Sequence, residues 1–498
     1  MSQIEIKHLT FSYPGQERPL FQDVDLNLDS EWKLGLFGRN GRGKTTLLKL
    51  LQGKLEYQGE ITQQVDFTYF PQEATDQSQL AIYALSENNS FEEWQLEREL
   101  NQMGVDPDLL WRPFEILSGG EQTKLMLALL FTDDNGFPLI DEPTNHLDID
   151  GRVQVAEYLK NKKQGFVVVS HDRDFIDACC NHILAIEKMK LELYHGNYST
   201  YQHEKGLRDE YETQQNTKLK KDIGRLKQTS ADKKRWAESR ESDNHGNPHI
   251  FGSGGTGHDG PTSARAARTM KRSKSLKKRM DNEISEKKKL LKNIEFIDPL
   301  SLAYKSSHHK TLVHTANLEL HYDKHSLFAP VSFNVKRGQC VALEGPNGSG
   351  KTSILRALTG KFTGKVTGEI RIPANISISY IRQMYENNTG TLQDFASEHQ
   401  LDFEMFLNNL HKLGLEREVF NQRIENMSMG QQKRVEVAKS LSQEAELYVW
   451  DEPLNYLDTY NQDQLIQLLS RTQPTVLLIE HDQHFIGEVA DKVVRLKK

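Results

Sequence analysis

The apolar positions of this 498-residue chain gather in short runs between polar stretches, and the same runs occur twice. Leu34–Phe37 and Val341–Leu343 are typical of short buried strands. Each precedes a glycine-rich loop and the start of a helix, which is Thr46–Leu51 in the first half. Further along, Pro138–Glu142 and Tyr448–Glu452 are apolar runs that each end in two carboxylates. The pattern predicts two copies of an α/β fold.

The repeat extends to the order and spacing of the motifs. GRNGRGKT at Gly38–Thr45 recurs as GPNGSGKT at Gly345–Thr352, so that the two loop lysines are 307 residues apart. LIDEPTNHLD recurs as VWDEPLNYLD after 310 residues. Because a whole set of motifs is repeated in register, we predict two nucleotide-binding domains in tandem, 1–202 and 301–498, joined by residues 203–300.

The segment between the repeats has a different pattern. Glu204–Arg240 carries apolar residues at mostly helical spacing, and a second such stripe runs from Leu276 to Ile294. The first stripe consists of Leu207, Tyr211, Leu219, Ile223 and Leu226. Ser242–Pro261 lies between the stripes and contains six glycines and two prolines, which interrupt a helix. We therefore predict a long antiparallel hairpin of two helices, with its tip at about 242–261.

Charge is distributed unevenly along the chain. The net charge is −7, yet residues 203–300 hold 23 Lys and Arg against 15 Asp and Glu. Between Ala264 and Lys292 the basic residues outnumber the acidic ones by 12 to 3. This arm suits contact with a polyanion. A solvated pair of charged helices is the alternative.

Composition limits the class of protein. Mean hydropathy is −0.65, and apolar stretches such as Leu125–Phe131 fall far short of the roughly 20 residues of a membrane span. The three cysteines argue against a disulfide framework, and no basic-then-apolar signal region opens the chain. We expect a cytoplasmic protein.

The glycine-rich loops have the composition of phosphate-binding loops. Gly38, Gly41 and Gly43 allow backbone N–H groups to turn inward around phosphates. Lys44 supplies a positive charge for the β- and γ-phosphates, and the Thr45 hydroxyl supplies a ligand for Mg²⁺. The second half offers the same groups in Gly345, Gly348, Gly350, Lys351 and Thr352.

The paired carboxylates complete the chemistry that phosphoryl transfer requires. Asp141 and Asp451 stand where a carboxylate can hold Mg²⁺, often through water. Glu142 and Glu452 can polarise an attacking water, because the reaction needs positioning and charge stabilisation more than covalent catalysis. The sequence thus predicts an ATPase with two candidate hydrolytic sites.

Between loop and carboxylates lies Ser118–Gln122, with the sequence SGGEQ, and with this signature both halves resemble the ATP-binding cassette superfamily. The resemblance implies that ATP and Mg²⁺ are the cofactors. It implies Mg²⁺ contacts from Thr45, Gln72, Asp141, Thr352, Gln383 and Asp451, and catalytic roles for Glu142, Glu452, His171 and His481. It further implies nucleotide contacts from Tyr13, Gly38, Arg39, Asn40, Gly41, Arg42, Gly43, Lys44, Thr45, Thr46, Ser118, Gly119, Gly120, Glu121, Tyr322, Gly345, Pro346, Asn347, Gly348, Ser349, Gly350, Lys351, Thr352, Ser353, Ser428, Met429, Gly430 and Gln431.

The resemblance also implies a geometry. The two cassettes close head to tail, so that Lys44 faces Ser428 and Lys351 faces Ser118. Leu147–Asp148 and Leu457–Asp458 match the loops that cross to the opposite cassette. The second signature has Met429 where the first has Gly119. This side chain either crowds the pocket built on Lys44 or points away from it.

The hairpin adds a resemblance to subfamily F, a group of tandem cassette ATPases that act on ribosomes. HGNYSTY at His195–Tyr201 matches the exit from cassette one into the linker. WRPF before the first signature, SARAARTMKRSK after the tip and MSMGQ in cassette two resemble the Lsa-type antibiotic-resistance branch. That branch protects ribosomes against lincosamides, pleuromutilins and streptogramin A.

The resemblance implies partners as well. They are the large-subunit rRNA at the ribosomal exit site and the peptidyl-site tRNA, met by a monomer whose two cassettes pair within the chain. The expected contact residues of the arm are Phe251, Arg265, Arg268, Lys271, Arg272 and Lys274. Two alternatives stay open: a housekeeping translation factor without a drug-resistance role, and an ATPase of another class that serves a membrane exporter or DNA repair.

Overall fold

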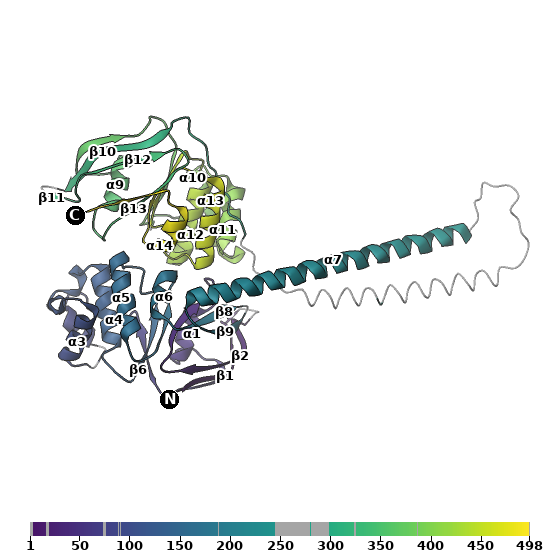
Figure 1. The fold of residues 1–498 in the computed structure, drawn as a ribbon, viewed down its shortest axis with the longest axis horizontal. Coiled ribbons are helices and arrows are strands. Elements are labelled where there is room, and N and C mark those ends of the chain that lie inside the picture. Colours follow the sequence, from purple (N-terminus) through teal and green to yellow (C-terminus); the bar gives the residue numbers. More distant parts are fainter. Residues whose placement is uncertain are drawn as a thin grey trace, which may run out of the picture. The chain divides into compact units, whose positions relative to one another are not determined.

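A computed structural model describes most of the chain (Figure 1). The described residues are 3–15, 19–72, 76–87, 89, 91–187, 189–244, 279, 298–322, 325–385 and 387–497. They belong to two compact units. One unit comprises Met1–Tyr201 together with Ile297–Lys498, and the other is Gln202–Phe296.

The first half of the chain is built on a six-stranded sheet with the order β5-β6-β7-β3-β8-β9. Its strands are β3 (Lys33–Phe37), β5 (Asp66–Phe70), β6 (Gly136–Asp141), β7 (Phe166–Val169), β8 (His182–Glu187) and β9 (Lys190–His195). All neighbours are parallel except β8 and β9. Alternate residues of a strand point to opposite faces. Accordingly, Val167 and Val169 pack into one core, and Phe166 and Val168 into another.

A smaller antiparallel sheet and a set of helices cover this sheet. The small sheet has the order β2-β1-β4, made of β1 (Gln3–Phe11), β2 (Phe21–Asp29) and β4 (Gln58–Thr62). The helices are α1 (Lys44–Leu51), α2 (Ala81–Ser86), α3 (Glu93–Met103), α4 (Gly119–Leu130), α5 (Ile149–Asn161) and α6 (Arg173–Cys179), with short 3₁₀ turns at Pro107–Trp111 and Phe114–Ile116. The core that contains Val167 also holds α1 and the small sheet, whereas the core that contains Phe166 holds α2 to α6. The phosphate loop therefore leads into α1, which packs against the same face of the sheet as the small sheet does.

The second half repeats this plan. Its parallel sheet has the order β15-β16-β17-β13-β18, which matches β5-β6-β7-β3-β8 strand for strand. The strands are β13 (Cys340–Glu344), β15 (Ile378–Ile381), β16 (Leu447–Asp451), β17 (Val476–Ile479) and β18 (Lys492–Arg495). The small sheet consists of β10 (Thr311–Tyr322), β11 (His325–Ser326), β12 (Val331–Lys336) and β14 (Lys365–Arg371). The helices are α9 (Lys351–Leu358), α10 (Leu392–Glu398), α11 (Phe403–Lys412), α12 (Met429–Ser442), α13 (Thr459–Thr472) and α14 (Gln483–Val489), with 3₁₀ turns at Arg417–Asn421 and Ile424–Asn426.

The strands predicted in the two repeats and the helix predicted after the first phosphate loop are confirmed with small shifts of their ends. The strand expected at Pro138–Glu142 is β6, which ends one residue earlier at Asp141. The strand expected at Tyr448–Glu452 likewise ends at Asp451. Both glutamates leave the strand because their φ angles, +55° and +49°, lie in the left-handed region.

The first helix of the predicted hairpin is α7 (Tyr198–Asn244), the long teal helix of Figure 1. It is longer at both ends than the segment expected from the apolar stripe. Along that stripe Ile223 is buried, whereas Leu207 and Tyr211 are exposed. The predicted tip and second helix lie outside the described residues, as do the contact residues Phe251, Arg265, Arg268, Lys271, Arg272 and Lys274. No helix among the described residues is long and apolar enough to span a membrane.

Candidate nucleotide sites

Backbone shape explains the glycines of both phosphate loops. Gly43 and Gly350 precede α1 and α9 with φ angles of +95° and +85°. A Cβ atom on Gly43 would lie 2.6 Å from Leu20 Cδ2, and one on Gly350 would lie 3.0 Å from Phe328 Cδ1. Both the torsion and the space therefore require glycine. The helices begin directly after these residues, so their N-terminal N–H groups and dipoles favour an anion there.

The loop lysines are held inside their own loops. Lys44 Nζ donates to Gly38 O at 2.7 Å and to Asn40 Oδ1 at 3.2 Å. Lys351 Nζ donates to Gly345 O at 2.6 Å and to Pro346 O at 3.0 Å. Burial lowers the pKa of both lysines, with nearby carboxylates acting in the opposite direction. Each loop thus carries a cation at its centre.

The expected magnesium ligands approach one another in both halves. Thr45 Oγ1 donates to Asp141 Oδ2 at 2.7 Å, and Thr352 Oγ1 donates to Asp451 Oδ1 at 3.3 Å. Burial raises the pKa of Asp451 to about 6. A tyrosine hydroxyl also reaches each carboxylate, from Tyr69 at 3.2 Å and from Tyr380 at 3.4 Å. Sequence reasoning missed these tyrosines, although both stand three residues before the predicted glutamines.

The candidate catalytic glutamates follow β6 and β16 in a strained turn. The N–H groups of Glu142 and Glu452 donate to Val169 O and Ile479 O at 2.9 Å, so the neighbouring strands hold the turn in place. His171 Nε2 lies 3.1 Å from Glu142 Oε1. Burial raises the pKa of Glu142 and lowers that of His171.

The corresponding histidine of the second half has a different environment. His481 is buried, and neither of its ring nitrogens has a hydrogen-bond partner among the described residues. Burial lowers the pKa of His481 to about 3. An unpartnered imidazole in a phosphate site is an observation that fits contact with a ligand.

The two predicted glutamines have different partners. Gln383 Nε2 donates to Glu452 Oε1 at 3.0 Å, so the structure brings these two residues together. Gln72 Oε1 instead accepts from Asn89 Nδ2 at 2.9 Å. Within the described part of the chain no hydrogen bond joins Gln72 to Glu142.

The aromatic residues expected at adenine lie at the rims of the loops. Tyr13 is partly exposed, and its hydroxyl lies 2.9 Å from Thr46 Oγ1 on α1. Tyr322 is exposed to a similar extent and packs against Phe362, with 5.0 Å between the ring centroids. Both side chains are thus partly accessible where stacking on adenine was expected.

The signatures begin α4 and α12 with matching caps. Ser118 accepts from Glu121 N while the Glu121 carboxylate accepts from Ser118 N, and Ser428 and Gln431 form the same box. The change from Gly119 to Met429 leaves this cap intact. The Met429 side chain is half-exposed.

A cavity of about 710 Å³ joins elements of both halves. Ser118, Gly119 and Gly120 line it together with the phosphate loop that carries Lys351. Gln383, Glu452 and His481 line it as well, and so do Tyr322, Ser353 and Met429. The groups predicted for the pocket of Lys351 therefore surround one space, and Met429, which was expected at the pocket of Lys44, lines the same space.

Reciprocal contacts cross between the halves. Asn347 N donates to Asp148 Oδ2 at 3.2 Å, and Asn40 N donates to Asp458 Oδ2 at 2.7 Å. Each aspartate also caps its own helix by accepting from Gly151 N or Asn461 N at 2.9 Å. The loops expected to cross between cassettes thus touch the opposite phosphate loop. In addition, the Arg39 guanidinium lies 3.9 Å from the centroid of the Tyr460 ring.

An ion pair between the described halves also lacks a counterpart at the equivalent positions. Arg173 at the start of α6 donates to Asp463 Oδ1 at 2.6 Å and to Thr459 O at 3.0 Å. The residues 310 positions away are Gln483 and Val153, which cannot form an ion pair. No motif marked Arg173, and only the approach of the two halves identifies it.

These paired sites define a tandem ATP-binding-cassette ATPase. The family described as ABC transporter matches the chain twice, over residues 21–145 and 328–455. The chain belongs to this family, and its relatives place it in subfamily F.

The comparison with curated proteins extends over nearly the whole chain. The ribosome protection protein VmlR of Bacillus subtilis is 27% identical, over 98% of this chain and 86% of its own length. The ATP-binding cassette sub-family F member 2 of Mus musculus is 26% identical, over 99% of this chain and 80% of its own length. The ABC transporter F family member 5 of Arabidopsis thaliana is 24% identical, over 100% and 75%.

A solved structure shares the fold. It is the complex of the archaeal ribosomal stalk protein aP1 with the archaeal ribosome recycling factor aABCE1, with a TM-score of 0.65. The match covers 98% of this chain and 87% of the other at 18% identity.

Proposed function

We propose that this ATPase binds the ribosomal exit site in its ATP-bound state and protects the peptidyl-transferase centre from lincosamide, pleuromutilin and streptogramin A antibiotics. ATP hydrolysis then drives its release. The observation that carries the proposal is the reciprocal closure of two cassettes within one chain, across a cavity that contains one signature and the opposite phosphate loop. The likeness to a ribosome protection protein along 98% of the chain supports the choice of partner. A ribosomal partner implies a cytoplasmic location.

The chain's own residues divide the work of hydrolysis. Lys44 and Lys351 exchange their loop carbonyls for phosphate oxygens, and the loop N–H groups bind the remaining charge. Glu142 and Glu452 orient the attacking water, while Gln383 fixes the carboxylate of Glu452 from the side. His171 and His481 contact the γ-phosphate.

The oxygen ligands in both halves fit Mg²⁺. In cassette one the Thr45 hydroxyl lies beside the Asp141 carboxylate, and in cassette two the Thr352 hydroxyl lies beside the Asp451 carboxylate. Oxygen atoms of this kind are the ligands that Mg²⁺ prefers. When bound, Mg²⁺ would neutralise charge that develops on the phosphates. Gln72 and Gln383 complete the proposed set.

The linker is the proposed contact with the peptidyl-site tRNA and the large-subunit rRNA. Helix α7 has 47 residues, which corresponds to about 70 Å at 1.5 Å per residue. The excess of basic residues after the tip suits phosphate contacts, where recognition depends largely on charge and shape. Phe251 and the basic residues from Arg265 to Lys274 belong to this proposed surface.

The test combines Glu142→Gln with Glu452→Gln. The double variant should bind ATP, lose turnover and stay on ribosomes that are pelleted in the presence of ATP. Cells that carry the parent gene should tolerate the three antibiotic classes. Retained turnover in the double variant would refute the roles of the glutamates.

Two further outcomes separate the alternatives. Ribosome binding without any change in drug susceptibility would favour a housekeeping translation factor. Absence from pelleted ribosomes, with and without ATP, would favour an exporter or DNA-repair ATPase. Replacing residues 244–262 by a short Gly-Ser turn should abolish protection but leave ATPase activity intact, because the arm belongs to neither cassette core.

A further inference from the structure

A buried ion-pair cluster joins the glutamine loop of cassette two to its signature helix. Glu436 on α12 has no exposed surface. Arg382 donates to both of its carboxylate oxygens, from Nε and Nη2, at 3.0 Å each. The Arg382 backbone N–H donates to Oε1 as well, at 3.2 Å. Lys439 Nζ, one turn further along α12, donates to the same oxygen at 2.5 Å. Asn388 Nδ2 donates to Oε2 at 2.9 Å.

The cluster is well satisfied despite its burial. Burial on its own raises the pKa of Glu436, but Arg382 and Lys439 outweigh it and bring the pKa to about 2. The carboxylate is therefore ionised and accepts five hydrogen bonds from four donor groups of the chain. The Arg382 guanidinium binds both carboxylate oxygens, and the Arg382 backbone N–H binds one of them. The Arg382 side chain therefore has little freedom to rotate. The residue that follows Arg382 is Gln383.

Cassette one has no such cluster at the matching positions. Arg382 corresponds to Pro71, Glu436 to Met126 and Lys439 to Leu129. None of these three side chains carries a charge. The glutamine that follows Pro71 bonds to Asn89 rather than to Glu142.

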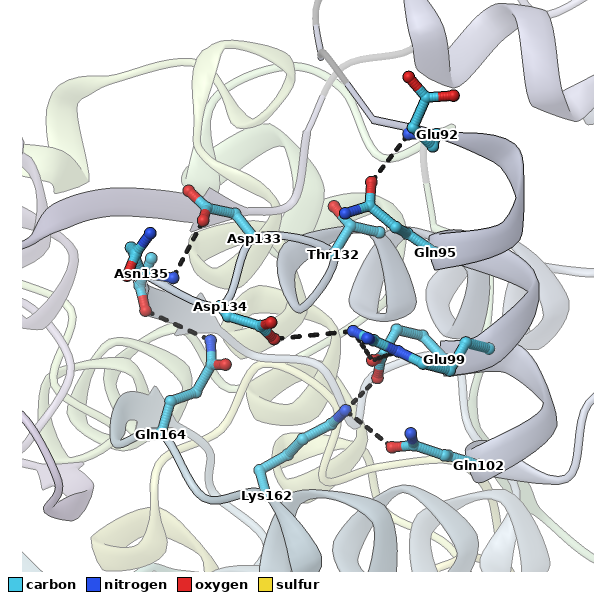
Figure 2. A network of polar contacts seen from close by, with 12 residues as sticks. Glu92, Gln95, Glu99, Gln102, Thr132, Asp133, Asp134, Asn135, Lys162 and Gln164 are labelled. Carbon is cyan, nitrogen blue, oxygen red and sulfur yellow. Dashed lines mark hydrogen bonds and ion pairs between the residues drawn. The ribbon is translucent and has the colours of Figure 1, made fainter.

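Cassette one has a buried carboxylate in a different place (Figure 2). Glu99 on α3 is paired with Arg98 and with Lys162 at the end of α5. Tyr158 OH donates to it at 2.6 Å. This cluster ties α3 to α5. Among the described residues, no hydrogen bond joins it to Gln72 or Gln383.

We propose that Arg382 and Glu436 are positioning residues that hold Gln383 against Glu452 and tie the glutamine loop of cassette two to α12. The chain of contacts runs from Glu452 through Gln383 and Arg382 to Glu436. Because the signature serine Ser428 caps α12, a movement of that helix displaces the signature and Gln383 together. The described residues of cassette one lack this connection, so the pocket of Lys351 is assembled in advance and that of Lys44 is not.

The test is a steady-state ATPase assay without ribosomes, so its result does not depend on the proposed cellular role. Glu142→Gln silences cassette one, and the remaining turnover reports on Glu452. In that background Arg382→Met should lower kcat about tenfold or more, because small displacements of a catalytic group are costly. KM for ATP should change by less than about twofold, since Arg382 contacts no nucleotide-binding group. Arg382→Lys should restore part of kcat because one ion pair can form again.

Folding is controlled in two ways. Arg382→Met leaves Glu436 paired with Lys439, so no buried charge is left alone. A second variant, Glu436→Met with Lys439→Leu, copies the residues of cassette one and removes the carboxylate partner of Arg382, whose side chain is 30% exposed and still donates to Asn388. It should lower kcat to a similar degree.

Lys162→Met is the matched control, because it removes one of two cations from the other buried carboxylate. Its kcat in the Glu142→Gln background should stay within about twofold of the parent. The proposal is overturned if Arg382→Met keeps its kcat. An equal loss of kcat in Lys162→Met, or an equal loss of kcat in Arg382→Lys and Arg382→Met, also overturns it.

Discussion

Replacing Arg173 by methionine should weaken the closure of the two cassettes by about 2 kcal/mol. Arg173 is buried, and its guanidinium reaches across to Asp463 Oδ1 and Thr459 O at 2.6 and 3.0 Å. Hydrogen bonds to a charged group contribute about 1.5–3 kcal/mol each. The Asp463 side chain is 34% exposed and returns partly to water when the partner is lost, which reduces the penalty. About 2 kcal/mol corresponds to a factor of about 30 in the equilibrium constant for closure.

The assay follows closure by energy transfer between two dyes. Glu157→Cys and Gln467→Cys give exposed labelling positions at equivalent places on α5 and α13. The three native cysteines are buried and should not react. In a Glu142→Gln, Glu452→Gln background, Arg173→Met should raise the ATP concentration at half-closure about 30-fold.

Two controls decide whether the ion pair is responsible. Gln483→Met alters the equivalent position of cassette two, where no ion pair crosses, and should shift half-closure by less than about threefold. A double-mutant cycle with Asp463→Asn should give a coupling energy of about 1 kcal/mol. A shift below about threefold in Arg173→Met, or a coupling energy near zero, would refute the reasoning.

Two further predictions concern the phosphate loops and signatures. Gly43→Ala should lower the ATP affinity of the first pocket about tenfold in a Lys351→Ala background, measured by titration with a fluorescent nucleotide, because the torsion of +95° costs about 1–2 kcal/mol and Leu20 blocks the new methyl group. An unchanged affinity would contradict this. If Met429 crowds the pocket of Lys44, then Met429→Gly should raise the ATPase rate of a Glu452→Gln variant about fivefold, equivalent to about 1 kcal/mol of relieved crowding. A constant rate would show that the side chain points away.

The sequence by itself determined the parts of this protein whose physics is local. A phosphate loop needs glycines, a lysine and a hydroxyl within eight residues, so the pattern at Gly38–Thr45 identified both the loop and the start of α1. The strands were recognisable because a parallel strand covered on both faces is an unbroken apolar run, as in Leu34–Phe37. Repetition then set the architecture, since the second half repeats the strand order of the first.

Only the tertiary structure decided which charged residues meet. Arg173 and Asp463 are 290 residues apart, and Arg382 and Glu436 are 54 apart. The chain has 63 basic and 70 acidic residues, and the identity of a charge carries no information about its partner. Arg382 meets Glu436 because α12 packs against β15, and Arg173 meets Asp463 because the two halves approach each other. The repeat even favoured a symmetric expectation for Gln72 and Gln383. The side chains around them, Asn89 on one side and the Arg382–Glu436 pair on the other, made the two pockets different.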